Sequence, residues 1–545
     1  MNSNASTDQN VASLMADVAR PLPSKPALVF ERNGSHETIS FSQLWQDANS
    51  VVGGLKKLGL TEGDRVIVMI PMSIDLYVCL LAIIQMGAIA VFVDPWIGAK
   101  QIARFSAFAE PTAFIGINKS HLLRWSNGRL RNIAISVTNE FRIGPFLASH
   151  SLSKLKSSQP DTQVAAVTPD QTALITFTSG SSGNPKGANR THRFLKSQHL
   201  ALKKEFPYQP DDIDMPMFPV FALNNLVTGI TSVVPEMDFR KVAEVSGDRI
   251  LAQMKDWKIT TCTASPPLLD RLADAIESRG SGGFHLRRAL TGGAPVSDQQ
   301  LQRWTSIFAS NAQPEPAEII VAYGSTEAEP VGHINGLDRI NNDGKSRGYC
   351  TGKPSSLVQT KIIPITKGVF DLEQRPLEEV ELPQGEIGEL IVAGDHVCRD
   401  YYKNEEATRE NKLIDKDGTV WHRMGDTGYF DDEGKFWLVG RVHSTIFRDS
   451  GIVHPQIIEQ IAKTASAEVL QVAAIGLNDP ILEVAVGLVV FTESENQNEI
   501  ELEIRVALKN ENQPCERVLF TDQPLPVDPR HNSKIDYEKV LEHFN

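Results

Sequence analysis

Short runs rich in Val and Ile alternate with amphipathic helical patterns along most of the chain, and this alternation limits the possible folds. The runs RVIVMI (65–70), AIAVFVD (88–94), ALITFT (173–178) and EIIVAYG (318–324) predict strands. Between such runs, stretches such as residues 42–59 place apolar side chains at helical spacing. Strands that alternate with helices favour an α/β fold with largely parallel sheets, which bind ligands beyond the carboxyl ends of their strands.

The chain is also too long for a single ordinary core. It has 545 residues, of which 41% are hydrophobic, so two or more well-buried domains are expected. The pattern changes after FWLVGR (436–441), where a small α+β unit begins. We therefore predict one domain over residues 1–441 and a second, of about a hundred residues, over 442–545.

Charge and cysteine usage exclude several functions. The formal net charge of −13 argues against a nucleic-acid binder, which needs clustered Lys and Arg. The five cysteines are far apart and form no C-x-x-C pair, so we expect reduced thiols in the cytoplasm. The N-terminus, MNSNASTDQN, lacks the basic and apolar segments of a signal peptide.

One apolar stretch tests the expectation of a soluble protein. Residues 76–93 carry a single polar side chain, Gln85, and are nearly long enough to cross a bilayer. Gly87 interrupts the stretch, and Asp75 and Asp94 bound it. These features favour a buried helix followed by a buried strand, with no membrane span.

The segment FTSGSSGNPKGANRTH (177–192) places an unusual number of glycines and hydroxyl groups directly after an apolar strand. Its glycines allow close approach of the backbone, its hydroxyl groups can donate to phosphate oxygens, and Lys186 adds a positive charge. It is not a Walker P-loop, because Pro185 stands where that motif has Gly. A phosphate cradle over residues 178–187 is predicted. The alternative is a flexible surface loop, which would require neither Lys186 nor the preceding strand.

Four further motifs follow in order: TGGAPV (291–296), VAYGSTEAEP (321–330), WHRMGDTG (421–428) and VDPRHNSKI (527–535). With the 178–187 loop, they resemble the signatures of the adenylate-forming superfamily, which includes acyl-CoA synthetases, luciferase and peptide-synthetase adenylation domains. The resemblance implies a large AMP-binding domain of several subdomains with parallel-rich sheets. It also implies a small mobile α+β lid, with ATP between the two.

The resemblance also implies a role for each motif residue. Tyr323 would stack on adenine, Thr326 would bond the α-phosphate, and Glu327 would hold Mg²⁺. The implied catalytic residues are Lys534, Thr326 and Glu327. The implied ATP contacts are Thr178, Ser179, Gly180, Ser181, Ser182, Gly183, Lys186, Gly292, Gly293, Ala294, Tyr323, Gly324, Ser325, Asp426 and Arg441. Taken singly, each could be an ordinary turn residue or a surface ion pair.

The implied reaction is attack of a small-molecule carboxylate on the α-phosphorus of ATP, with release of pyrophosphate. Both reactants are anionic, so the site must neutralise them and stabilise charge on the phosphoryl oxygens. Mg²⁺, the loop hydroxyls and Lys534 would do so. Because Lys534 lies in the implied lid, closure about a hinge at residues 441–444 would assemble the site and exclude water.

Several positions depart from the common acyl-CoA synthetase pattern: Ala222, Ser444, Ser450 and Ser533. Together with FPVFAL (218–223) and VVPEMD (233–238), they are similar to the β-lactone synthetases of bacterial olefin biosynthesis. That branch implies a long-chain 2-alkyl-3-hydroxy acid whose own hydroxyl closes a cis-β-lactone. Transfer of a fatty acyl group to CoA or to a carrier-protein thiol stays open, as do other enzymes of the same pathway as partners. No residue is identified as the base for the hydroxyl.

Overall fold

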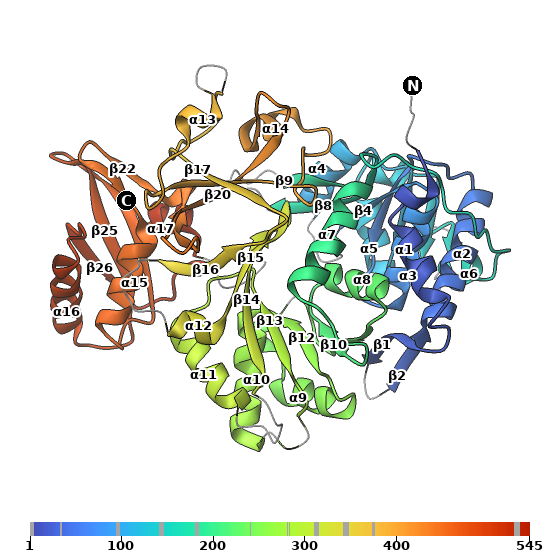
Figure 1. Ribbon diagram of the computed structural model, residues 1–545, viewed down its shortest axis with the longest axis horizontal. Coiled ribbons are helices and arrows are strands. Elements are labelled where there is room, and N and C mark those ends of the chain that lie inside the picture. Colours follow the sequence, from blue (N-terminus) through green and yellow to red (C-terminus); the bar gives the residue numbers. More distant parts are fainter. Residues whose placement is uncertain are drawn as a thin grey trace.

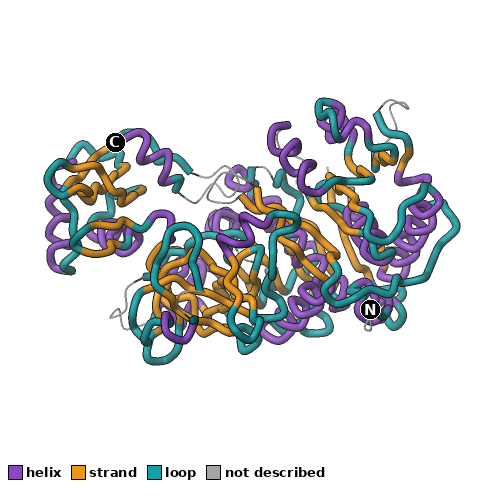
Figure 2. Tube along the Cα trace, turned by 90° about the horizontal axis from the view of Figure 1, so that it is seen from above, coloured by secondary structure: helices purple, strands orange, loops and turns teal. Residues whose placement is uncertain are grey.

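The computed structural model describes most of the chain, namely residues 5–32, 35–93, 99–140, 147–179, 185–239, 241–280, 282, 284–309, 316–341, 348–372, 376–527 and 535–544. Two sheets with helices around them form a body, and a smaller unit made of the C-terminal residues lies at one end of it (Figures 1 and 2). This arrangement confirms the predicted α/β class.

The first sheet is almost entirely parallel, as predicted. Its order is β7 (His150–Ser151), β6 (Ile135–Thr138), β5 (Ala113–Gly116), β3 (Arg65–Met69), β4 (Ile89–Phe92), β8 (Thr172–Ser179) and β9 (Pro185–Thr191). Only β9 runs antiparallel, to β8. The strands of this β8–β9 hairpin extend into the segment that was predicted as a phosphate loop.

Helices from the first half of the chain pack around this sheet. They are η1 (Thr7–Gln9), α1 (Ala12–Ala19), α2 (Phe41–Lys57), α3 (Ile74–Gln85), α4 (Ala99–Ala109), α5 (Asn118–Trp125), η2 (Leu130–Asn132), α6 (Leu152–Lys156), α7 (His192–Glu205) and α8 (Pro219–Thr228). The predicted helix over 42–59 corresponds to α2, whose first turn is capped by the Ser40 side chain.

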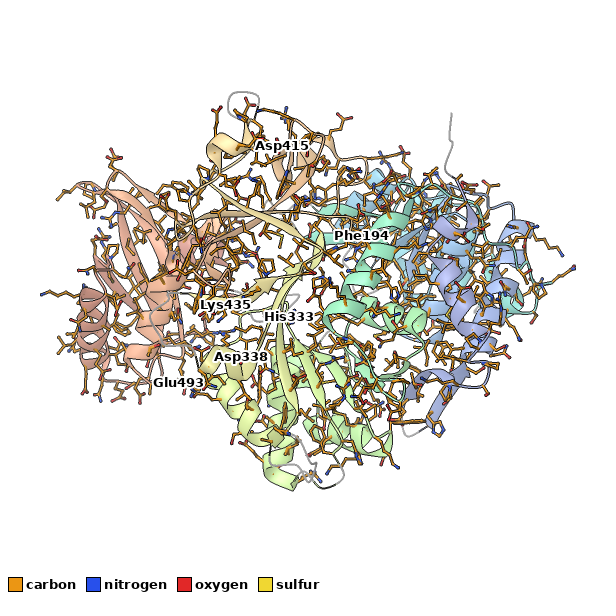
Figure 3. All side chains as sticks on the ribbon, in the orientation of Figure 1. Phe194, His333, Asp338, Asp415, Lys435 and Glu493 are labelled. Atoms are coloured by element: carbon orange, nitrogen blue, oxygen red, sulfur yellow. The ribbon has the colours of Figure 1, made fainter. Side chains whose placement is uncertain are left out.

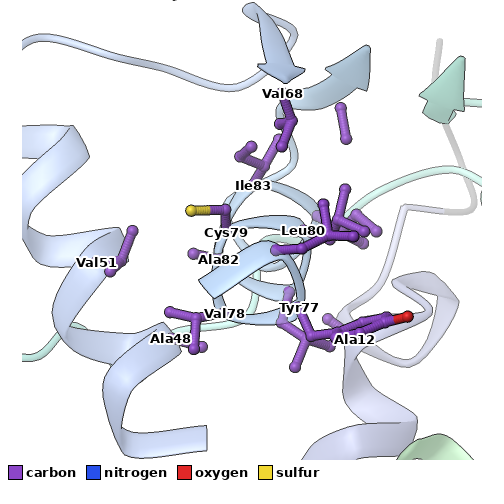
Figure 4. Packing of buried hydrophobic residues seen from close by; sticks show 14 of the residues in the cluster. Ala12, Ala48, Val51, Val68, Tyr77, Val78, Cys79, Leu80, Ala82 and Ile83 are labelled. Carbon is purple, nitrogen blue, oxygen red and sulfur yellow. The ribbon is translucent and has the colours of Figure 1, made fainter. Parts of the chain in front are cut away.

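The apolar stretch 76–93 forms most of helix α3 and all of strand β4. Side chains on several faces of α3, including Tyr77 and Cys79, are buried among residues of α1 and α2 (Figure 4). Gly87 follows with a φ of +74°, a left-handed conformation that favours glycine, and the chain then enters β4. The predicted helix, break and strand are confirmed, and no helix in the described part of the chain is long and apolar enough to cross a membrane.

The second sheet has a parallel half and an antiparallel half. Its order is β17 (Gln359–Ile363), β18 (Gly388–Ala393), β20 (Val420–Phe430), β21 (Phe436–Arg441), β16 (Tyr349–Pro354), β15 (Ala328–Asn335), β14 (Glu318–Ser325), β13 (Arg288–Thr291), β12 (Thr261–Ala264), β10 (Ile213–Pro216), β11 (Thr231–Val234), β1 (Pro26–Arg32) and β2 (Ser35–Ser40), with β19 (Lys412–Ile414) paired to β20. The strands from β14 to β1 are parallel, whereas those from β15 to β17 are antiparallel. The expectation of largely parallel sheets therefore fails in this half.

The remaining body helices accompany the second sheet. They are η3 (Val242–Glu244), α9 (Gly247–Asp256), α10 (Pro266–Arg279), α11 (Asp298–Ala309), α12 (Gly336–Ile340), α13 (Leu377–Val380) and α14 (Glu405–Asn411). A buried cluster that includes Leu269, Trp304 and Phe308 joins α9, α10 and α11 to the parallel strands. The strands are thereby fixed against the helices, and their carboxyl ends form a firm support for the loops that follow them.

The C-terminal unit has its own apolar core. It contains η4 (Val442–Ser444), β22 (Ile446–Arg448), β23 (Gly451–Val453), α15 (Pro455–Ala465), β24 (Gln471–Asp479), β25 (Glu483–Phe491), α16 (Gln497–Asn510), β26 (Arg517–Thr521) and α17 (Tyr537–Phe544). Two buried clusters, one around Ile458 and Leu488 and one around Ala473 and Val540, draw only on residues from Ile446 onward. We propose that residues 442–545 are the predicted lid and that the hinge lies at residues 441–444.

Candidate active site

Two motif loops meet at the carboxyl ends of neighbouring parallel strands. Gly292 and Gly293 directly follow β13, and the turn formed by Thr326 and Glu327 follows β14. A Cβ on Gly292 would lie 2.6 Å from the Ala322 carbonyl oxygen, so only glycine fits there. Gly293 has a φ of +79°, which also favours glycine. The TGGAPV sequence is therefore explained by close backbone packing beside β14.

The Asp426 cluster, consisting of Tyr323, Asp426 and Arg441, forms one wall of this region. Asp426 and Arg441 are paired across β20 and β21, and the Arg441 Nε lies 2.8 Å from the Asp426 Oδ1. The Tyr323 hydroxyl donates to the Asp426 Oδ2 at 2.6 Å. Burial and the Asp426 charge raise the pKa of Tyr323 well above its usual value, so it remains a donor. The structure thus brings three predicted site residues together.

The Glu327 cluster, consisting of Lys186, Glu327, Tyr401 and Lys412, joins segments that are far apart in the sequence. The Tyr401 hydroxyl donates to the Glu327 Oε1 at 2.9 Å. The Lys186 and Lys412 ammonium groups lie 5.7 Å and 5.3 Å from the centre of the Tyr401 ring. Lys412 also donates to the carbonyl oxygen of Cys398, whose backbone N–H donates to the Glu327 carbonyl oxygen at 2.7 Å.

The electrostatics of the Glu327 cluster favour an anionic ligand. Burial lowers the pKa of Lys412 to about 8. Burial also lowers the pKa of Lys186, although the charges of Glu410 and Glu327 act to raise it. Burial raises the pKa of Glu327, but His422, Lys412 and the Tyr401 hydrogen bond together bring it below its usual value. Two buried ammonium groups therefore lie in this cluster with one buried carboxylate, and ammonium groups form strong hydrogen bonds to phosphate oxygens.

The predicted phosphate segment is only partly described. Thr178 and Ser179 end β8, and Lys186 pairs with Thr178 from β9. Gly180, Ser181, Ser182 and Gly183 lie outside the described residues, as does Lys534. Val527 and Ile535, the nearest described residues on either side of Lys534, form an isolated antiparallel bridge.

The other predicted residues lie at the end of β14 and in the loop after β13. Gly324 and Ser325 end β14 directly before Thr326, and Ala294 follows the two glycines after β13. A Cβ on Gly324 would lie 2.7 Å from the Ala328 carbonyl oxygen, so this position also requires glycine. The Thr326 carbonyl oxygen accepts a hydrogen bond from the Arg190 Nη2 at 2.8 Å, which fixes the turn to β9.

Sequence reasoning missed Tyr401 and Lys412. An isolated bridge between Ala188 and Tyr401 and a bond from the Tyr402 N–H to the Gly187 carbonyl oxygen bring the 400–402 segment to β9. Lys412 begins β19, in a sequence, ENKLID, that is typical of an exposed strand end. No local pattern distinguishes this buried lysine from an ordinary surface residue.

The fold and the two clusters define the class of protein. The family model described as AMP-binding enzyme matches residues 15–402, and the chain belongs to this family. It is an AMP-forming ligase that activates a carboxylic acid.

Similarity extends over nearly the whole chain to particular relatives. An olefin beta-lactone synthetase of Xanthomonas campestris is 30% identical over 99% of this chain and 98% of its own length. That of Stenotrophomonas maltophilia is 28% identical over 97% of each chain. The fold matches that of ATP-bound MatB from Rhodopseudomonas palustris with a TM-score of 0.76, at 21% identity over 98% of this chain and 99% of that one.

Proposed function

We propose that this ligase closes a 2-alkyl-3-hydroxy acid to a cis-β-lactone after activating it as the acyl-AMP. The observation that carries the proposal is the full-length similarity to the two olefin beta-lactone synthetases. The departures at Ala222, Ser444 and Ser450 support it, since they lie where the acyl-CoA synthetase pattern has other residues.

The two clusters suit different parts of ATP. We assign the ribose hydroxyls to Asp426 and Arg441, because a carboxylate accepts hydrogen bonds from hydroxyl groups and the guanidinium donates to them. We assign the phosphates to Lys186 and the hydroxyl groups of residues 178–182, and the α-phosphate to Thr326. With this assignment, the substrate carboxylate that attacks the α-phosphorus would bind beside the turn after β14.

Glu327 fits the proposed Mg²⁺. No group of three or more metal-binding side chains occurs among the described residues, but Mg²⁺ is commonly held by one or two carboxylates together with substrate phosphates. Glu327 is buried and its pKa is below the usual value, so it is ionised at neutral pH. When bound, Mg²⁺ would neutralise charge on the phosphate oxygens.

The second step needs no other substrate. The oxygen of the 3-hydroxyl group forms a bond to the acyl carbonyl carbon, the bond from that carbon to the AMP oxygen breaks, and the hydroxyl proton is released. AMP leaves with the bonding electrons. Because the nucleophile is part of the same molecule, proximity replaces a second binding event.

Product identification tests this function. The protein is incubated with ATP, Mg²⁺ and a syn-2-alkyl-3-hydroxy acid, with and without CoA, and the products are identified by mass. We expect AMP, pyrophosphate and a lactone that has lost one water relative to the acid, whether or not CoA is present. Consumption of the acid only when CoA is added would instead establish an acyl-CoA ligase.

The role proposed for Lys534 can be tested separately. Lys534→Ala should lower the rate of acid-dependent ATP–pyrophosphate exchange on the order of 10²–10³, since one charge contact to the transition state is lost. Binding of a non-hydrolysable ATP analogue should change far less. Lys539→Ala is the matched control, because Lys539 is exposed and forms a surface ion pair with Asp536 at 2.7 Å. Equal losses of exchange and ATP binding would contradict the proposed role.

A further inference from the structure

Strand β15 leaves its register with β14 directly after the Thr326–Glu327 turn. Ser325 pairs with Ala328, but the next pair is Tyr323 with Gly332, so Glu329, Pro330 and Val331 stand opposite Gly324 alone. A bulge of this kind redirects side chains and is common beside active sites. A Cβ on Gly324 would lie 3.4 Å from the Glu329 Cβ, so the Glu329 side chain starts against the motif strand.

The Glu329 carboxyl has no hydrogen-bond or ion-pair partner among the described residues. In the part of the chain that the structure describes, no donor lies within hydrogen-bond or ion-pair distance of it, and the charge that acts on it is that of Arg190. Its side chain is only partly covered, so a ligand can reach it. A carboxylate held in this state lacks the donors that it would have in water.

Arg190 faces the same turn from β9. Its side chain is 3% exposed, its Nη2 donates to the Thr326 carbonyl oxygen, and its guanidinium lies 5.2 Å from the centre of the Phe194 ring. The Nε of Arg190 is buried and has no hydrogen-bond partner among the described residues. Figure 3 labels Phe194 on α7, the helix that follows β9, and His333 on β15, the strand that contains Glu329. The buried arginine therefore has unused donors beside an acid with unused acceptors.

The pair lies between the site of activation and an apolar cavity. The Gln198 Nε2 donates to the Glu329 carbonyl oxygen at 3.2 Å. Gln198 also lines a cavity of about 30 Å³ between α7 and α8, together with Leu195, Leu202 and Leu223. An acid activated at Thr326, with its alkyl chain directed toward this cavity, would carry the atoms next to its carboxyl group past Arg190 and Glu329.

We propose that Arg190 and Glu329 form a polar subsite that binds a hydroxyl group of the acyl substrate, close to the carboxyl group that is activated. Arg190 donates to the hydroxyl oxygen and Glu329 accepts its hydrogen, so both roles of the hydroxyl are satisfied. The inference rests on the proposed function and makes these residues the basis of selectivity for hydroxy acids over fatty acids.

Selectivity between two acids provides the test. The values of kcat/KM for pyrophosphate release are compared for a 3-hydroxy acid and for the same acid without the hydroxyl group. Wild-type protein should prefer the hydroxy acid, because a site built for a polar group rejects the analogue that lacks it. Glu329→Leu and Arg190→Leu should each reduce this preference at least tenfold. Glu329→Gln, which keeps an acceptor, should recover part of it, and Glu244→Leu, at an exposed acid, should leave it unchanged.

Each outcome decides a different question. If the variants slow both acids equally, the two residues are only structural and the inference fails. If wild-type protein activates both acids equally well, the proposed hydroxyl subsite is wrong, whereas the adenylation of an acid is unaffected. If no acid supports pyrophosphate release, the proposed function itself fails. Should Arg190→Leu not fold, as judged by circular dichroism, Glu329→Leu decides alone, because its loss breaks no hydrogen bond of the carboxyl group within the described part of the chain.

Discussion

The Asp426 cluster and the Glu327 cluster lie in the same candidate site but bury different charges. In the first, the buried charge is that of Asp426, which accepts from Tyr323 at 2.6 Å and meets the Nε of the partly exposed Arg441 at 2.8 Å. The Asp426 Oδ1 accepts no hydrogen bond from the described residues, so this cluster suits neutral hydroxyl groups. In the second, Lys186, Lys412 and Glu327 are all buried, and the partly exposed Glu410 lies 3.9 Å from Lys186. Its buried ammonium groups suit a polyphosphate.

The largest effect is expected from Glu327→Gln, which changes the Glu327 cluster. We expect acid-dependent pyrophosphate exchange to fall on the order of 10²–10³, because the proposed metal ligand is lost and two lysines lose their carboxylate. The exchange should also require more Mg²⁺ for half-maximal rate, which a titration of Mg²⁺ would measure.

Glu410→Gln is the control for this comparison. Glu410 lies 3.9 Å from Lys186 and its side chain is partly exposed, so its loss should lower the exchange rate less than tenfold. If both variants lose activity to the same extent, or if Glu327→Gln leaves the Mg²⁺ dependence unchanged, the two acids are equivalent and the assignment of Glu327 is wrong.

The two clusters also show what a sequence can and cannot predict. Tyr323, Asp426 and Arg441 could be named because each stands in a local motif whose strand the apolar pattern also predicts. Tyr401 and Lys412 could not, because an isolated bridge to β9 and the edge strand β19 bring them to Glu327, and neither leaves a local signal. The antiparallel half of the second sheet was missed for a similar reason, since a run such as GELIVAG reads the same in either direction of pairing.

A second prediction concerns the pH dependence of stability. Burial lowers the pKa of Lys412 from 10.5 to about 8, so the unfolded chain binds more protons than the folded protein between these values. The contribution of Lys412 to stability therefore rises with pH through this window, by about 2 kcal/mol from pH 8 to pH 10. The Lys412→Met variant has no ammonium group and lacks this gain in stability. In urea titrations, the difference in unfolding free energy between wild type and the variant should therefore increase by about 2 kcal/mol from pH 8 to pH 10.

Lys416→Met separates burial from the simple loss of a lysine. Lys416 is exposed and lies 3.4 Å from Glu378, so its removal should leave a difference from wild type that is constant over the same pH range. A constant difference for Lys412→Met as well would mean that Lys412 is solvated, and the contrast between the two clusters would disappear.

The smallest effect is expected from Tyr323→Phe in the paired cluster. The variant keeps the ring that packs 5.7 Å from Phe436 but loses the hydrogen bond to Asp426. Because Arg441 still pairs with Asp426, we expect the Kd for a non-hydrolysable ATP analogue to rise about tenfold, equivalent to about 1.5 kcal/mol, with little change in kcat. Calorimetric titration measures this, with Tyr429→Phe on β20, the strand of Asp426, as control. A loss as large as that of Glu327→Gln, carried by kcat, would show that Tyr323 acts in the chemical step and that the Asp426 cluster is not simply a preformed wall for the nucleotide.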